Sequence, residues 1–203
     1  MFYRYLILTT IFLSVLAHAG STTELSVTGR ITPSACEPTL SAAGQYDLGK
    51  ISARDLNVDQ PTRLTAHELQ LKVTCEAMTL LALETRDNRS GSSYSDRLYT
   101  FGLGLINDAI KLGYMTLELN SITAQGTPMY ALGSTWAGWG PTSILSPEFL
   151  TAFTPNKSMA VPAPVQLLNA NVQIAPTIAP ANTLPLTEEV PIDGFVTLTV
   201  KYL

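Results

Sequence analysis

Histidine and cysteine are scarce in this sequence, and their scarcity excludes several classes of catalytic and metal site. The 203 residues include two histidines and two cysteines. A structural zinc site takes about four such ligands, and a Ser-His-acid hydrolase needs a histidine beside its nucleophile. The sequence has no Gly-x-Ser-x-Gly elbow, phosphate-binding loop or His-Glu-x-x-His motif. We therefore expect no catalytic residue, no metal and no cofactor, and a protein that is not an enzyme.

Basic residues are also few, which argues against several charged partners. Twelve Lys and Arg stand against 16 Asp and Glu, for a net charge of −4. No Lys/Arg cluster of the kind that binds nucleic acid or anionic lipid is present. We expect no nucleic-acid partner.

The N-terminal residues have the pattern of a secretory signal. Arg4 is followed by a short apolar run, Leu6 to Leu16, and then by the small-x-small sequence Ala17-His18-Ala19. The run is too short for a membrane-spanning helix, which needs about 20 apolar residues. We expect cleavage between Ala19 and Gly20, so that residues 1–19 are removed. The exported chain, 20–203, then forms one domain without a transmembrane anchor.

The two cysteines, Cys36 and Cys75, both lie in the part expected to be exported. An even pair of cysteines in an oxidising compartment most often forms a disulfide. Closing this loop stabilises by roughly 3–4 kcal/mol on the chain-entropy model. His67, the one histidine left after cleavage, precedes an expected strand and has no catalytic partner in view, so we interpret it as structural.

Apolar and polar residues alternate along most of the exported chain, which predicts an all-β fold. Thirteen Gly and 13 Pro fit many turns and few long helices. One short helix is possible at Pro147–Phe153, where Ser146 is placed to cap it. The expected strands lie at about 25–32, 68–75, 81–83, 98–106, 114–119, 165–174 and 195–203.

Residues 121–164 have a different texture, rich in Gly, Pro and aromatic side chains, and we interpret them as an insertion. A connection this long is usually functional or poorly ordered. Two interpretations of Tyr130, Trp136 and Trp139 stay open. They form a surface for a carbohydrate or a partner chain, or they fold back as a small core under the loop, since large aromatics rarely stay exposed without a partner.

Five segments, in order, carry a resemblance to a known family: Val27–Cys36, Tyr46-Asp47-Leu48-Gly49, Leu69–Cys75, Phe101–Asp108 and Gly194–Leu203 with its penultimate tyrosine. They resemble subunits of chaperone–usher pili, and more closely a group of exported fimbrial-like proteins of Gram-negative bacteria whose function is not established. The resemblance implies an immunoglobulin-like β-sandwich that lacks its seventh strand, with the Cys36–Cys75 disulfide placed as in pilins.

The missing strand leaves a groove along the C-terminal strand, which in the family a periplasmic chaperone or the next subunit fills. Side chains on one face of that strand would line the groove: Val196, Leu198, Val200 and Tyr202. The resemblance therefore implies a pilus chaperone and other fimbrial subunits as partners, and a location in the periplasm or on the cell surface, in the fimbrium.

One departure from the family decides which kind of subunit we expect. Only residues 20–26 would remain as a donor extension, and Leu25 is their sole large apolar residue. Such an arm is short and polar for a donor that must fill several pockets. We expect a structural, adhesion-related subunit that associates by strand complementation as a minor or capping component. The alternative is a free periplasmic or surface module that binds a carbohydrate or protein through the Trp136/Trp139 loop.

Overall fold

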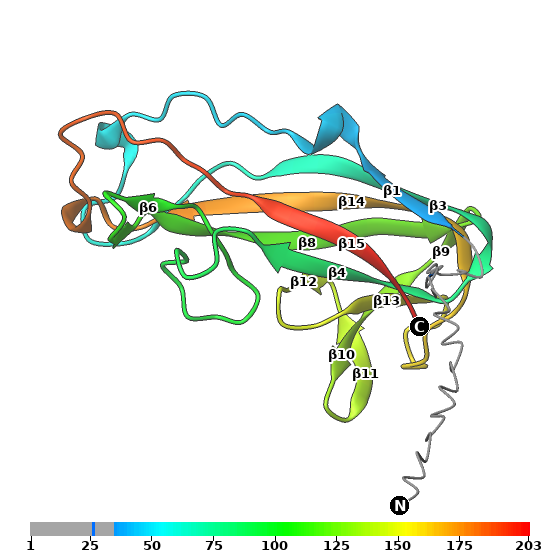
Figure 1. Ribbon diagram of the computed structural model, residues 1–203. Helices are drawn as coiled ribbons and strands as arrows, with labels where there is room; N and C mark the ends of the chain where they lie inside the picture. The colour runs from blue at the N-terminus through cyan, green and yellow to red at the C-terminus, as the bar shows by residue number, and fades with distance from the viewer. Residues whose placement is uncertain (1–25, 27–34) are drawn as a thin grey trace, which may run out of the picture. The chain divides into compact units, whose positions relative to one another are not determined.

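The computed structural model describes Ser26 and residues 35–203. The expected signal, its cleavage site at Ala19 and Gly20, and most of the first expected strand lie outside these residues. The described chain consists of β-strands joined by loops and three short 3-10 helices, η1 (Ser41–Gly44), η2 (Ala53–Asp55) and η3 (Ala181–Thr183) (Figure 1). The prediction of an all-β fold is confirmed.

The larger sheet is antiparallel and contains the longest strands. Its main path runs in the order β1 (Cys36–Leu40), β3 (His67–Thr79), β14 (Val165–Ile178), β8 (Gly113–Ala124) and β12 (Ile144–Leu145). Three two-residue strands pair beside this path: β2 (Thr62–Arg63) with β14, and β5 (Phe101–Gly102) and β9 (Thr127–Pro128) with β8. The short strand β1 therefore forms one edge of the path.

The second sheet is also antiparallel, and the last strand of the chain forms one of its edges. Its order is β11 (Gly138–Thr142), β10 (Tyr130–Thr135), β13 (Thr151–Thr154), β4 (Leu81–Asp87) and β15 (Val196–Tyr202). A separate small hairpin joins β6 (Leu105–Ile106) to β7 (Ile110–Lys111).

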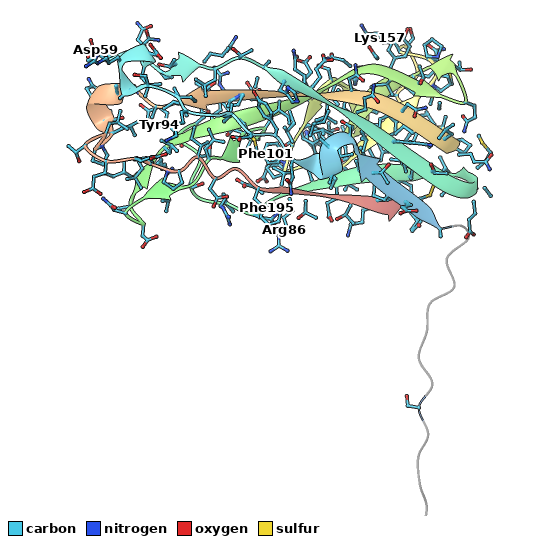
Figure 2. All side chains as sticks on the ribbon, turned by 90° about the horizontal axis from the view of Figure 1, so that it is seen from above. Asp59, Arg86, Tyr94, Phe101, Lys157 and Phe195 are labelled. Carbon is cyan, nitrogen blue, oxygen red and sulfur yellow. A yellow bond between two sulfur atoms is a disulfide. The ribbon has the colours of Figure 1, made fainter. Side chains whose placement is uncertain are left out.

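One apolar core lies between the two sheets and explains why these strands form. In β3, Leu69, Leu71, Val73 and Cys75 are buried while the residues between them are exposed, which is the period of two that a strand with one buried face requires. The core joins Leu71, Val73 and Cys75 to Leu83 of the other sheet. Phe101, labelled in Figure 2, is fully buried in the same core.

The expected disulfide is present. Cys36 and Cys75 face each other across β1 and β3, with their Cα atoms 4.0 Å apart and their sulfurs bonded. The bond fastens the edge strand β1 to the long central strand β3. Because Cys75 lies in the main core, the start of β1 is anchored to the interior.

Residues 121–154 consist largely of strands, and only 155–164 form a loop, so the interpretation of 121–164 as one long connection is wrong. It contains the end of β8, β9, the β10–β11 hairpin, β12 and β13. Residues 147–153 do not form the short helix. The Ser146 hydroxyl does accept a hydrogen bond from the Glu148 N–H at 3.1 Å, but the chain continues into a turn and then into β13, whose four residues are all buried.

Candidate functional site

The last strand, β15, presents one edge of its backbone without a partner strand among the described residues. Its other edge pairs with β4. Phe195 O accepts from Asn88 N at 2.9 Å, and Leu203 N donates to Leu80 O at 3.1 Å. Because peptide groups alternate in direction along a strand, the odd-numbered residues face β4. The N–H and C=O groups of the even-numbered residues of β15 therefore point to the open edge.

An apolar groove of about 340 Å³ lies beside this edge. Val196 and Leu198 line it from β15, and Leu40, Tyr46 and Leu48 line it from β1 and the loop that follows. Side chains of the larger sheet lie beneath, among them Leu117, Val172 and Ile174. The groove is thus bounded by an edge of each sheet and reaches toward the core.

A second cavity, of about 700 Å³, continues from this groove. The two cavities share Tyr46, Leu48 and Ile192. The second lies between two loop segments, 46–56 and 186–192, and combines apolar side chains with the exposed ion pair of Lys50 and Glu189, 3.6 Å apart. The lining of this cavity is therefore partly charged, whereas the groove beside β15 is lined mainly by apolar side chains.

Of the four residues that we expected along the groove, the structure places two there. Val196 and Leu198 line the groove. Val200 packs against the core. Tyr202 bridges to β1, because its hydroxyl accepts a hydrogen bond from the Cys36 N–H at 3.1 Å. The open part of the groove therefore ends before Val200, and the Tyr202–Cys36 bond spans the gap between the two edges beyond it.

The aromatic residues singled out in the sequence lie on the β10–β11 hairpin, away from the groove. Trp136 stands at the hairpin turn and is 100% exposed. It does not fold back into a small core, contrary to the second interpretation. Trp139 in β11 is half-buried, and Tyr130 at the start of β10 is exposed. The turn is held by Thr135, whose hydroxyl donates to Gly138 O at 2.9 Å.

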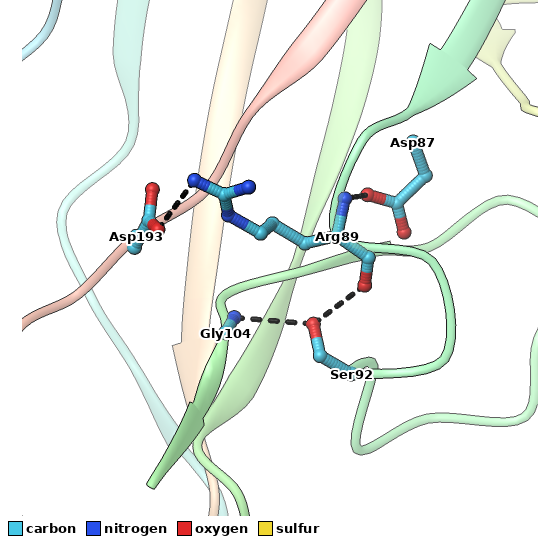
Figure 3. A network of polar contacts seen from close by, with 5 residues as sticks. All are labelled: Asp87, Arg89, Ser92, Gly104 and Asp193. Carbon is cyan, nitrogen blue, oxygen red and sulfur yellow. Dashed lines mark hydrogen bonds and ion pairs between the residues drawn. The ribbon is translucent and has the colours of Figure 1, made fainter. Parts of the chain in front are cut away.

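A polar network that we did not predict holds the chain just before β15 (Figure 3). Arg89 forms an ion pair with Asp193 at 2.5 Å, and its guanidinium lies 5.7 Å from the centre of the Phe195 ring. Asp87 accepts from the backbone N–H of Arg89 at 2.8 Å. Arg89 and Asp193 are 104 positions apart in the sequence, and no motif links them.

The remaining predicted features have structural explanations. His67 stacks on Tyr46, with ring centroids 4.0 Å apart. Gly102 lies where a Cβ atom would be 2.7 Å from Arg89 O, so the backbone approaches closely at this position. The described residues contain no group of three or more His, Cys, Asp or Glu placed to hold a metal. No helix among them is long and apolar enough to cross a membrane.

These features define a class of protein: an all-β, sandwich-like domain fastened by one disulfide, with an apolar groove beside its last strand. The chain belongs to the family described as "Protein of unknown function (DUF1120)", whose model matches residues 25–139. It is similar to two proteins of Escherichia coli K12. It is 26% identical to protein GltF, over 94% of this chain and 92% of GltF. It is 24% identical to the uncharacterized protein YhcF, over 98% of both chains.

Proposed function

We propose that this protein is an exported structural subunit that binds a β-strand of another polypeptide in the groove beside β15, as a minor or capping component of a fimbrium. A disulfide persists in oxidising compartments outside the cytosol, which supports export. In this proposal the fold is an incomplete, pilin-like immunoglobulin sandwich, and the partners are a periplasmic pilus chaperone and other fimbrial subunits. The observation that carries the proposal is the open edge of β15 next to an apolar groove.

An incoming strand would pair with the open backbone edge of β15 and would place apolar side chains in the groove beside it. An open strand edge is a template for another strand, and the peptide groups of Val196 and Leu198 point toward it. In such complexes main-chain hydrogen bonds give affinity and alternate side chains give register. Each apolar side chain buried in the groove would contribute about 1.5–3 kcal/mol, reduced by the cost of ordering the incoming strand.

The position of the first strand supports the pilin-like interpretation. Leu40, at the end of β1, and the segment that follows it line one side of the groove, and β15 lines the other. Cys36 fastens β1 to β3. A strand inserted between β1 and β15 would join the two sheets along this side. The insertion would remove an exposed edge, and native proteins generally avoid leaving such edges uncovered.

A peptide-binding experiment tests the proposal. The exported chain beginning at Gly20 is titrated with a synthetic peptide of about ten residues in which Val and Thr alternate, a pattern that presents one apolar face. At a peptide concentration of about 100 times Kd, binding adds about 2.7 kcal/mol, which raises the thermal midpoint by roughly 5–10 °C. Co-expression with a pilus chaperone should raise the soluble yield.

Two substitutions in β15 distinguish peptide binding in the groove from a general effect of changing the strand. Leu198 faces the groove, whereas Thr197 is exposed and lies beside it in the sequence. Leu198→Asn should abolish the shift caused by the peptide, and Thr197→Asn should preserve it. A midpoint that the peptide leaves unchanged in the unsubstituted chain would refute strand binding. Equal peptide shifts in the two variants would refute this groove as the site.

A second candidate function rests on Trp136, because a fully exposed tryptophan on an ordered turn is unusual for a protein without a partner. The chain carries no charged residue from Leu119 to Pro147, so the hairpin would suit a neutral ligand such as a saccharide. In this candidate the protein is a free binding module. Screening on a glycan array tests it: Trp136→Ala should abolish any binding found and leave the thermal midpoint unchanged.

A further inference from the structure

The wall of the groove on the β15 side continues beyond the strand as an extended segment, residues 190–195. Val190, Pro191 and Ile192 line the larger cavity, and Ile192, Gly194, Phe195 and Val196 line the groove. Regular pairing with β4 begins only at Val196. The part of the wall between the two cavities has no such ladder. Single backbone hydrogen bonds hold it, from Asp193 N to Leu103 O at 3.1 Å and from Asn88 N to Phe195 O at 2.9 Å, together with side-chain contacts.

Arg89 holds this part of the wall from outside. Its guanidinium pairs with Asp193 at 2.5 Å and lies over the ring of Phe195, 5.7 Å from its centroid. These two residues flank Gly194 in the sequence and both are exposed, although Phe195, like Gly194, also lines the groove. One arginine thus contacts the wall on both sides of its inward-facing glycine. Figure 3 shows the ion pair with Asp193.

The backbone around Arg89 is itself fixed by several hydrogen bonds. Asp87 accepts from Arg89 N at 2.8 Å with one carboxylate oxygen and from Gly102 N at 2.9 Å with the other. The Ser92 hydroxyl donates to Arg89 O at 2.7 Å and accepts from Gly104 N at 3.1 Å. The support therefore extends from the end of β4 to the strand β5, which adds to the larger sheet.

On its inner side, the wall at Gly194 lies close to the core. A Cβ atom placed there would be 3.0 Å from Leu103 Cδ2 and 3.1 Å from Met115 Cε. Both of these side chains also line the groove. A small displacement of the wall at Gly194 would therefore change the width of the groove at its junction with the larger cavity.

We propose that Arg89 is a positioning residue for strand binding, which holds the wall at Asp193–Phe195 at the separation that admits an incoming strand. This inference rests on the function proposed above. Arg89 fixes the wall before the strand arrives, so less conformational freedom is lost on binding, and preorganisation of this kind raises affinity. The incoming chain is an extended peptide with alternating apolar side chains, and Arg89 acts on it only through the wall.

The test compares peptide affinities of variants that remove the contacts one at a time. The probe is a fluorescein-labelled, alternating Val/Thr peptide of about ten residues, followed by anisotropy. Exposed ion pairs and cation–π contacts each contribute up to about 1 kcal/mol, and about 1.4 kcal/mol corresponds to a factor of ten. Arg89→Met should therefore weaken binding roughly three- to tenfold. Asp193→Asn should weaken binding less than Arg89→Met does. Arg89→Lys should retain part of the affinity that Arg89→Met loses.

Glu84→Gln is the matched control. It removes another exposed ion pair, with Lys201 of β15 at 3.0 Å, but Lys201 does not line the groove. The Glu84→Gln variant should bind the peptide with the same affinity as the unsubstituted chain. A general loss of stability would weaken binding in this variant too, so the comparison separates positioning from stability.

Amide hydrogen exchange, measured without peptide, gives a second readout. Exchange at residues 193–196 should accelerate in Arg89→Met and stay unchanged in Glu84→Gln. If the unsubstituted chain binds the peptide and Arg89→Met binds it equally well, the positioning role is wrong and the proposed function stands. If the unsubstituted chain binds no peptide, both are wrong, and faster exchange then shows only that Arg89 stabilises the loop.

Discussion

The hydroxyl of Tyr202, the last residue of β15, accepts a hydrogen bond from the backbone N–H of Cys36, the first residue of β1, at 3.1 Å. The bond joins the edges of the two sheets across the side of the sandwich where the groove lies. Since Cys36 is also bonded to Cys75, the end of the last strand is tied to the core through the disulfide. The Tyr202–Cys36 bond therefore limits how far along β15 a partner strand pairs.

Removing the Tyr202 hydroxyl should destabilise the protein slightly without changing its fold. Tyr202→Phe keeps the ring and loses one hydrogen bond, which contributes about 0.5–1.5 kcal/mol. In a chain of this size the thermal midpoint should fall by roughly 1–6 °C. Tyr94→Phe is the control, since Tyr94 is similarly exposed and its hydroxyl has no partner among the described residues. Equal midpoints in the two variants would contradict a stabilising role for the Tyr202–Cys36 bond.

Breaking the disulfide should destabilise the protein more than any of the other substitutions. The Cys36→Ala/Cys75→Ala variant loses a cross-link between residues 39 positions apart, which costs roughly 3–4 kcal/mol on the chain-entropy model. Chemical denaturation of the two proteins measures the difference. A reducing agent should lower the denaturation midpoint of the unsubstituted chain to that of the variant and should not affect the variant. A variant as stable as the parent would contradict this prediction.

Gly102 should tolerate no side chain. A Cβ atom at this position would overlap the Ser92 hydroxyl and lie 2.7 Å from Arg89 O, and overpacking of this kind costs about 1–3 kcal/mol. Gly102→Ala should lower the free energy of unfolding by that amount. Gly140→Ala is the matched control in another strand, because the nearest atom to its Cβ would be 3.9 Å away. An equal loss in the two variants would exclude the close approach as the cause.

The strands that the sequence predicted well are those with one buried and one exposed face. β3 and β15 alternate along most of their length, so their period of two is visible without any structure. β13 is buried at all four positions and therefore shows no alternation. The β10–β11 hairpin is interrupted by glycines and a proline, which resemble loop residues, although they lie within paired strands.

The groove itself was expected from the resemblance to pilus subunits, and the alternation of the last strand placed Val196 and Leu198 on one face of that strand. The two contacts that delimit and support the groove, Tyr202 with Cys36 and Arg89 with Asp193, join residues more than 100 positions apart. Such pairings arise from the order of strands in the sheets, and local patterning carries no information about them.

The two tryptophans should differ clearly in their access to solvent. Trp136 is 100% exposed and Trp139 is half-buried, so variants with one tryptophan each isolate their fluorescence. Trp139→Phe, which keeps Trp136, should show the more red-shifted emission and the steeper quenching by acrylamide. Trp136→Phe should change the free energy of unfolding by less than about 0.5 kcal/mol, as for most surface substitutions. Equal quenching of the two variants would show that Trp136 is covered in solution, by another copy of the chain or by the hairpin itself, and would remove the basis for a binding role of the hairpin.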